Sequence, residues 1–124
     1  MTTSSFELVP GTATKVFEED LPAGTYAVVE QLGHATLVGR VKQVEKFGAQ
    51  FLQIEPLFQD WMLPEILLGG ASLYRLTPCT PVTAWNMRAK YRHELPSSVA
   101  AQIPEEADPV FAPAFLGYDL GDDE

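Results

Sequence analysis

The side chains best suited to chemistry are few and lie far apart in this sequence. The two histidines are His34 and His93, and neither belongs to a group of cysteines or acids at ligand spacing. A zinc site needs three or four grouped ligands. Cys79 is the single cysteine, which excludes an intramolecular disulfide and suits a reducing cytoplasm. We therefore expect no metal site and no bound cofactor.

Catalytic motifs are also missing from the sequence. It contains no Gly-x-Ser-x-Gly nucleophile elbow and no Walker or dinucleotide-binding glycine pattern. Glu30 and Glu55 fall on different expected strands and could approach each other, although strand carboxylates are common at surfaces. We therefore expect no catalytic residues and a binding protein rather than an enzyme.

Size and charge limit the class of protein further. The 124 residues are enough for one domain with a modest core, and 46% of them are hydrophobic. No apolar run approaches the roughly 20 residues of a membrane-spanning helix, and the first residues do not resemble a signal peptide. We expect a cytoplasmic protein that does not enter a membrane.

The net charge of −9 is concentrated at the C-terminal end. Seven of the 17 acidic residues lie in residues 104–124, which contain no lysine or arginine. The rest of the chain is close to neutral. A near-neutral domain with an acidic extension is poorly suited to neutralising phosphates, so direct binding of nucleic acid is not expected.

The alternation of apolar residues predicts a mainly β protein. Strands are expected at residues 25–32, 36–45, 49–55 and 71–76, with weaker ones at 6–9 and 14–17. Gly33-His34 and Lys46-Phe47-Gly48 are the expected turns, and Pro56 is expected to end the third strand. Gly39, in the middle of a strand, indicates a bulge, a bend or close approach of another backbone.

The remaining segments predict a helix and a tail around this sheet. Thr80-Pro81 is a typical helix start, and the helix is expected over residues 81–92. Residues 57–70 are expected to cross one mouth of the sheet irregularly. The predicted fold is a small bent antiparallel sheet or barrel-like domain in residues 1–96, with one C-terminal helix. Residues 97–124 are expected to be an extended or partly ordered acidic tail.

Four stretches resemble a group of small phage and prophage proteins of unassigned function. They are Tyr26-Ala-Val-Val-Glu-Gln-Leu-Gly-His34, Gly39-Arg-Val41, Phe51-Leu-Gln-Ile-Glu-Pro56 and Ala71-Ser-Leu-Tyr-Arg-Leu-Thr-Pro78. The similarity covers about 50 residues, and the Gly-His turn and the Tyr-x-Leu-Thr-Pro ending are its most particular parts. It implies a phage-associated β-rich protein and assigns no catalytic residue.

Two functional hypotheses follow. The first is an accessory protein in the host cytoplasm that binds a host or phage protein, for example to inhibit a defence or nucleic-acid-processing complex. Its interface, which could equally serve a homodimer, is expected from apolar residues of 57–70 and of the tail: Phe58, Trp61, Met62, Phe111, Phe115 and Tyr118. The alternative is an oligomeric barrel that sequesters a small ligand or nucleotide in a pocket formed by His34, Arg40 and Arg75.

Overall fold

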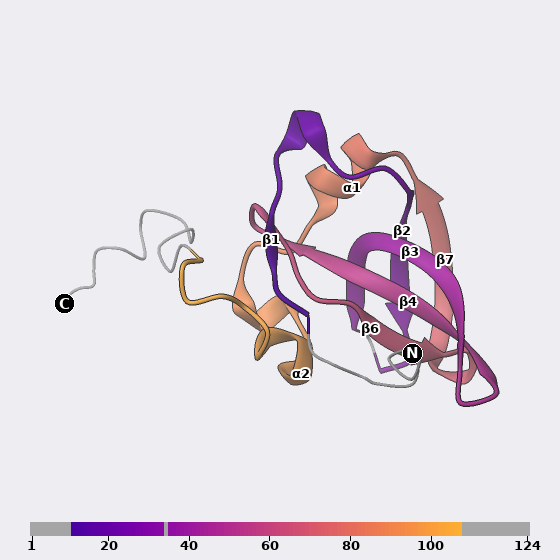
Figure 1. Ribbon diagram of the computed structural model, residues 1–124. Helices are drawn as coiled ribbons and strands as arrows, with labels where there is room; N and C mark the ends of the chain where they lie inside the picture. Colours follow the sequence, from indigo (N-terminus) through magenta and orange to yellow (C-terminus); the bar gives the residue numbers. More distant parts are fainter. Residues whose placement is uncertain (1–10, 34, 108–124) are drawn as a thin grey trace, which may run out of the picture.

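The centre of the molecule is a long hairpin of two bent strands. The computed structural model describes residues 11–33 and 35–107. Strand β3 (Thr36–Lys46) and strand β4 (Ala49–Phe58) pair along almost their whole length (Figure 1). Phe47 and Gly48 join them with φ values of 55° and 77°, as the two central residues of a type I′ hairpin turn require. This two-residue turn fixes the register of every cross-strand pair in the hairpin.

The other strands extend this hairpin into a seven-stranded antiparallel sheet. Its order is β1-β5-β4-β3-β2-β7, and β6 also pairs with β4. The added strands are β1 (Thr14–Lys15), β2 (Thr25–Gln31), β5 (Trp61–Met62), β6 (Ile66–Gly69) and β7 (Leu73–Cys79). Among the described residues β1 and β7 do not pair, so the sheet stays open. The predicted mainly β, bent antiparallel fold is confirmed.

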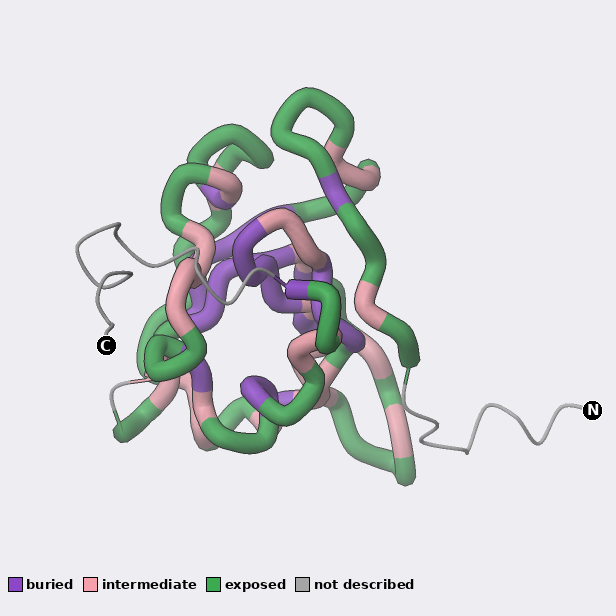
Figure 2. Tube along the Cα trace, turned by 90° about the vertical axis from the view of Figure 1, so that its left-hand side faces the viewer, coloured by how far each residue is buried: buried purple, intermediate pink, exposed green. Residues whose placement is uncertain are grey.

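Both faces of the sheet carry a buried cluster, because alternate residues of each strand point to opposite faces. On one face Tyr26, Val28 and Val38 pack with Ala84 of helix α1 (Pro81–Met87). On the other face the buried strand residues pack with Leu95 and with Val99 of helix α2 (Ser97–Ala100). Figure 2 shows the buried positions gathered in the interior and the exposed ones along the outer loops. Each fully buried aliphatic or aromatic side chain stabilises the fold by roughly 1.5–3 kcal/mol.

The backbones of β3 and β4 approach each other closely at Gly39 and Pro56. These two residues lie opposite each other in the pairing. A Cβ atom on Gly39 would collide with the Glu55 carbonyl oxygen and would lie 2.8 Å from the Glu55 carbonyl carbon. Of the alternatives expected for Gly39, close backbone approach is therefore confirmed.

The expectation that Pro56 ends its strand is wrong. The missing N–H of Pro56 faces away from β3, and on that side its carbonyl oxygen accepts a hydrogen bond from the Leu63 N–H at 2.7 Å. No ladder bond to β3 is lost, and β4 continues to Phe58.

The predicted helix is shorter than expected. The Thr80 hydroxyl caps it by accepting a hydrogen bond from the Thr83 N–H at 3.1 Å, as the sequence indicated, but α1 ends at Met87. The Arg88 Nε donates to the Gln59 carbonyl oxygen at 2.6 Å, and the Gln59 N–H donates to the Ala89 carbonyl oxygen at 2.8 Å. These bonds hold the following residues in an extended conformation beside the end of β4, so tertiary contacts override the helical pattern.

The domain also extends further along the chain than the boundary expected after residue 96. Residues 97–107 contribute Val99, Ala100 and Ala107 to the buried cluster beneath the sheet. They belong to the domain, so the boundary expected after residue 96 is wrong. Short 3₁₀ turns complete the described chain: Glu18–Asp20, Gly70–Ser72 and Arg92–Glu94. The predicted strand at 6–9, and the remainder of the predicted tail, lie outside the described residues.

Candidate functional site

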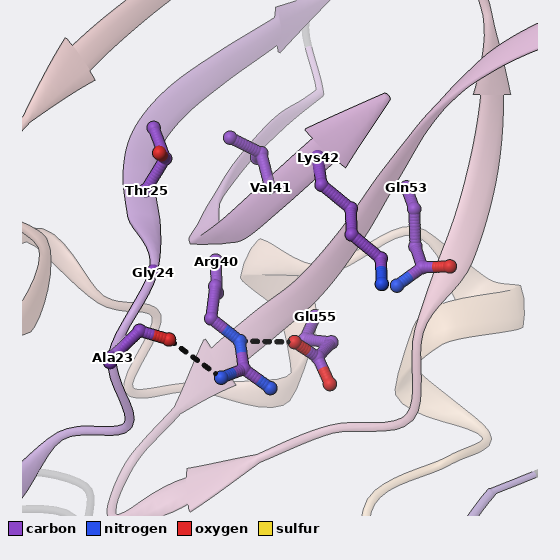
Figure 3. A pocket seen from close by; sticks show the side chains of 8 residues that line it. All are labelled: Ala23, Gly24, Thr25, Arg40, Val41, Lys42, Gln53 and Glu55. Carbon is purple, nitrogen blue, oxygen red and sulfur yellow. Dashed lines mark hydrogen bonds and ion pairs between the residues drawn. The ribbon is translucent and has the colours of Figure 1, made fainter. Parts of the chain in front are cut away.

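A polar hollow of the described surface lies on the β3–β4 hairpin, beside the loop that leads into β2. It has a volume of about 400 Å³ and is lined by Ala23, Gly24, Thr25, Arg40, Val41, Lys42, Gln53 and Glu55 (Figure 3). The hairpin register places Arg40 opposite Glu55 and Lys42 opposite Gln53. The four long side chains therefore stand together on one face.

The Arg40 guanidinium is held in place from two sides. Its Nε donates to Oε1 of Glu55 at 2.6 Å, and its Nη1 donates to the Ala23 carbonyl oxygen at 2.9 Å. A Cβ on Gly24 would lie 2.6 Å from the Arg40 Cδ, and the Gly24 φ of 146° is one that favours glycine, so a larger residue would displace the arginine side chain. The bond to Glu55 raises the pKa of Arg40 above its ordinary value. The side chain is thus a fixed cation whose Nη2 donates to no described residue.

Two side chains of the lining carry hydrogen-bond donors that no described acceptor occupies. The Lys42 ammonium forms no ion pair with a described residue, and the Gln53 side-chain amide has no described partner. Figure 3 shows these two groups next to each other above the Arg40–Glu55 pair. Glu55 supplies the lining's single carboxylate, and that carboxylate is already bound to Arg40. The free donors can therefore bind an anionic group.

Tyr26 forms part of the support beneath this hollow. It lies opposite Arg40 in the sheet, and its hydroxyl donates to the Pro22 carbonyl oxygen at 2.7 Å. Burial raises the pKa of the Tyr26 hydroxyl above its ordinary value of 10.0, an effect that the nearby positive charge of Arg40 partly offsets. Folding therefore favours the protonated, uncharged form of the Tyr26 hydroxyl.

Tyr26 gives a prediction about stability at alkaline pH. Since its pKa is raised in the folded state, unfolded chains release this proton first as pH rises above 10.0. The stabilisation is complete below that pH and is lost as pH rises through the folded pKa. We expect the ultraviolet difference spectrum of wild type against Tyr26→Phe to give a midpoint above 10.0. The Tyr26→Phe variant should lose about 1 kcal/mol at neutral pH with the hydrogen bond; a midpoint at or below 10.0 would contradict the burial argument.

Of the three residues predicted to share a ligand pocket, the two that the structure describes, Arg40 and Arg75, are not brought together. Arg40 lies opposite Tyr26, whereas Arg75 lies opposite Glu30, four residues further along β2. At about 3.3 Å per residue this separates the two rows by roughly 13 Å. Arg75 faces Glu30 instead, with Nη1 3.9 Å from Oε1. His34 lies outside the described residues; of the other two, Arg40 lines the hollow and Arg75 does not.

The proposed carboxylate pair does not form either. Glu55 bonds Arg40 and Glu30 faces Arg75, so each acid neutralises an arginine on a different row of the sheet. In the part of the chain that the structure describes, no three His, Cys, Asp or Glu side chains form a group able to hold a metal ion. Cys79 is half-buried, and burial raises the pKa of its thiol.

The apolar residues predicted as an interface are mostly inside the fold. Phe58 is 3% exposed and Met62 is 4% exposed, and both belong to the buried clusters. Trp61 is half-buried, with the Lys15 ammonium 4.8 Å from its ring centroid. The expectation of an exposed patch in this segment is therefore wrong. The other predicted interface residues, Phe111, Phe115 and Tyr118, lie outside the described residues.

Comparison with known proteins adds no family to this description. No family model matches the chain, and no curated protein or solved structure matches it either. None of the described helices is long and apolar enough to cross a membrane. The functional conclusion therefore depends on the geometry of the hollow and of the sheet edges.

Proposed function

We propose that this protein binds a small ligand through an anionic group, without catalysing a reaction on it. The observation that carries the proposal is the set of unpaired donors around the Arg40 guanidinium, whose position Glu55, Ala23 and Gly24 fix before any ligand arrives. Arginine matches the geometry of carboxylate and phosphate oxygens. The volume of about 400 Å³ is within the usual range for small-molecule sites.

The chemistry of the lining narrows the ligand class. It has no aromatic ring on which a nucleobase could stack, and its four long side chains are all polar. A phosphate or carboxylate group fits these donors better than a base does. Within the phage resemblance, such a protein would act in the host cytoplasm by sequestering its ligand.

A titration with inorganic phosphate and with acetate tests this proposal. We expect saturable shifts of the Gly24, Lys42 and Gln53 amide resonances in a nitrogen–proton correlation spectrum. Lys42→Ala should weaken the binding about tenfold, which corresponds to the loss of one charge-assisted contact. The relative strength of the two titrations assigns the group as phosphate or carboxylate.

Lys90→Ala is the matched control for this titration. It removes the same charge and side chain at a position outside the hollow, and it should leave the binding unchanged. Equal losses in the two variants would indicate general attraction of anions by surface charge and would contradict a site at Arg40. Shifts that do not saturate would contradict it as well.

A second candidate is the binding of a host or phage protein by an accessory protein. Phe58 and Met62 of the interface first expected for it are buried, but the edge of the sheet at β7 supplies another surface. There Tyr74 is 62% exposed and Leu76 is 39% exposed. The inhibition of a defence or nucleic-acid-processing complex remains a proposal of this kind.

A further inference from the structure

Strand β7 has an unpaired outer edge. It ends the strand order of the sheet, and no described strand or helix pairs with its other side. All residues from Tyr74 to Pro78 are exposed. Figure 1 shows β7 along one side of the molecule. Unpaired edges of this kind invite another strand to add.

The hydrogen bonds of β2 show which β7 groups face outward. The Gln31 N–H donates to the Ala35 carbonyl oxygen at 2.8 Å, so odd-numbered residues of β2 bond towards β3. Even-numbered residues therefore bond towards β7, and Val28 pairs in this way with Thr77. The backbone groups of Leu76 and Pro78, which lie opposite Val29 and Ala27, must then face the open edge. Pro78 suits this position because it has no N–H to leave unpaired.

We propose that a second copy of this chain adds to this edge, with the two β7 strands antiparallel about a two-fold axis at Leu76. The Leu76 N–H and carbonyl oxygen then bond reciprocally with those of Leu76 of the partner subunit. The exposed ring of Tyr74 packs beside Pro78 of the partner subunit, whose free carbonyl oxygen faces the same gap. Each copy presents the same surface to the other, as a two-fold interface requires.

Charge and hydrogen bonding select this register over its neighbours. A shift of one residue would turn the side chains of one strand to the wrong face. An axis at Arg75 would place two guanidinium groups directly opposite each other. An axis at Thr77 would pair Leu76 with a proline that cannot donate. With the axis at Leu76, each Arg75 lies opposite a neutral threonine, so no like charges oppose each other.

Hydrogen exchange on the unmodified full chain tests the proposal directly. The Leu76 amide faces water in a single copy and is bonded in the pair, so its exchange should slow as protein concentration rises. The Thr77 amide bonds within the sheet in both states and is the internal control. Molar mass by sedimentation should rise over the same range. If the mass stays that of one copy, or the Leu76 amide exchanges at the same rate throughout, the proposal is overturned.

A pair of variants identifies the surface. Leu76→Lys should weaken self-association at least tenfold, because it places two ammonium groups against each other at the axis. Phe47→Lys likewise replaces an exposed apolar side chain with an ammonium group, at the hairpin turn, where Phe47 is 63% exposed, and should leave association unchanged. Equal effects of the two would overturn the interface at β7. If the Leu76 amide is protected from exchange only when a different protein is added, a second copy is not the occupant and the proposal is overturned. If Leu76→Lys does not fold, the hydrogen exchange of the unmodified chain tests the proposal alone.

Discussion

Gly39→Ala is expected to destabilise this domain strongly, although it adds only one methyl group. Its Cβ would overlap the Glu55 carbonyl oxygen and lie 2.9 Å from the Pro56 Cα, and both are backbone groups that cannot rotate away. The strands of the central hairpin would have to separate. We expect a loss of about 3 kcal/mol or more in the free energy of unfolding, at the upper end of overpacking costs. Denaturant unfolding followed by circular dichroism measures it.

Gly69→Ala is the control for Gly39→Ala. Gly69 also lies in a strand paired with β4, and a Cβ there would meet no atom within 4 Å. We expect its midpoint of unfolding to stay near that of wild type. Similar losses in both variants would mean that glycine flexibility, and not the closeness of β3 to β4, explains the effect.

Phe58→Ala is expected to destabilise the fold rather than to remove a binding partner. Phe58 is 3% exposed and packs in the cluster that includes Ile54, Leu63 and Val99. Truncation of a buried phenylalanine costs about 3–5 kcal/mol, which is a large part of the 5–15 kcal/mol typical of a domain. Thermal or denaturant unfolding of the purified variant should show this loss directly.

Phe17→Ala removes the same atoms from the surface, since Phe17 is 55% exposed. We expect it to change stability by no more than about 0.5 kcal/mol. If Phe58→Ala were as stable as Phe17→Ala, the ring would not be packed as described, and an interface role for Phe58 would return.

The long strands were predictable because each carries its own local signal. Alternating apolar residues mark β2, β3 and β4, and Phe47-Gly48 marks the turn. The short strands β5 and β6 have no such signal, since they are held by pairing with opposite ends of β4. The apolar residues of that segment could therefore be read as a surface, although the pairing places Phe58 and Met62 inside.

The candidate site could be predicted in part. Arg40 was identified by its residue type, but Lys42, Gln53 and Glu55 were not grouped with it. The signal was available, because a two-residue turn at Phe47-Gly48 places Arg40 opposite Glu55 and Lys42 opposite Gln53. Nothing local indicates that the Ala23-Gly24 loop folds over the guanidinium, since that contact depends on where β2 joins the sheet.

The two-residue turn also has a consequence for how the chain assembles. Strands β3 and β4 are joined by Phe47 and Gly48 alone, so their pairing closes a loop of two residues, as short as the Gln59-Asp60 loop between β4 and β5. The partners β2 and β7 are more than forty residues apart in the sequence, and their pairing must order everything between them. Because loop closure costs more entropy as the loop lengthens, the hairpin is the natural folding nucleus and β7 joins late. Strand β7 can then detach from the edge of the sheet while the β3–β4 hairpin stays paired.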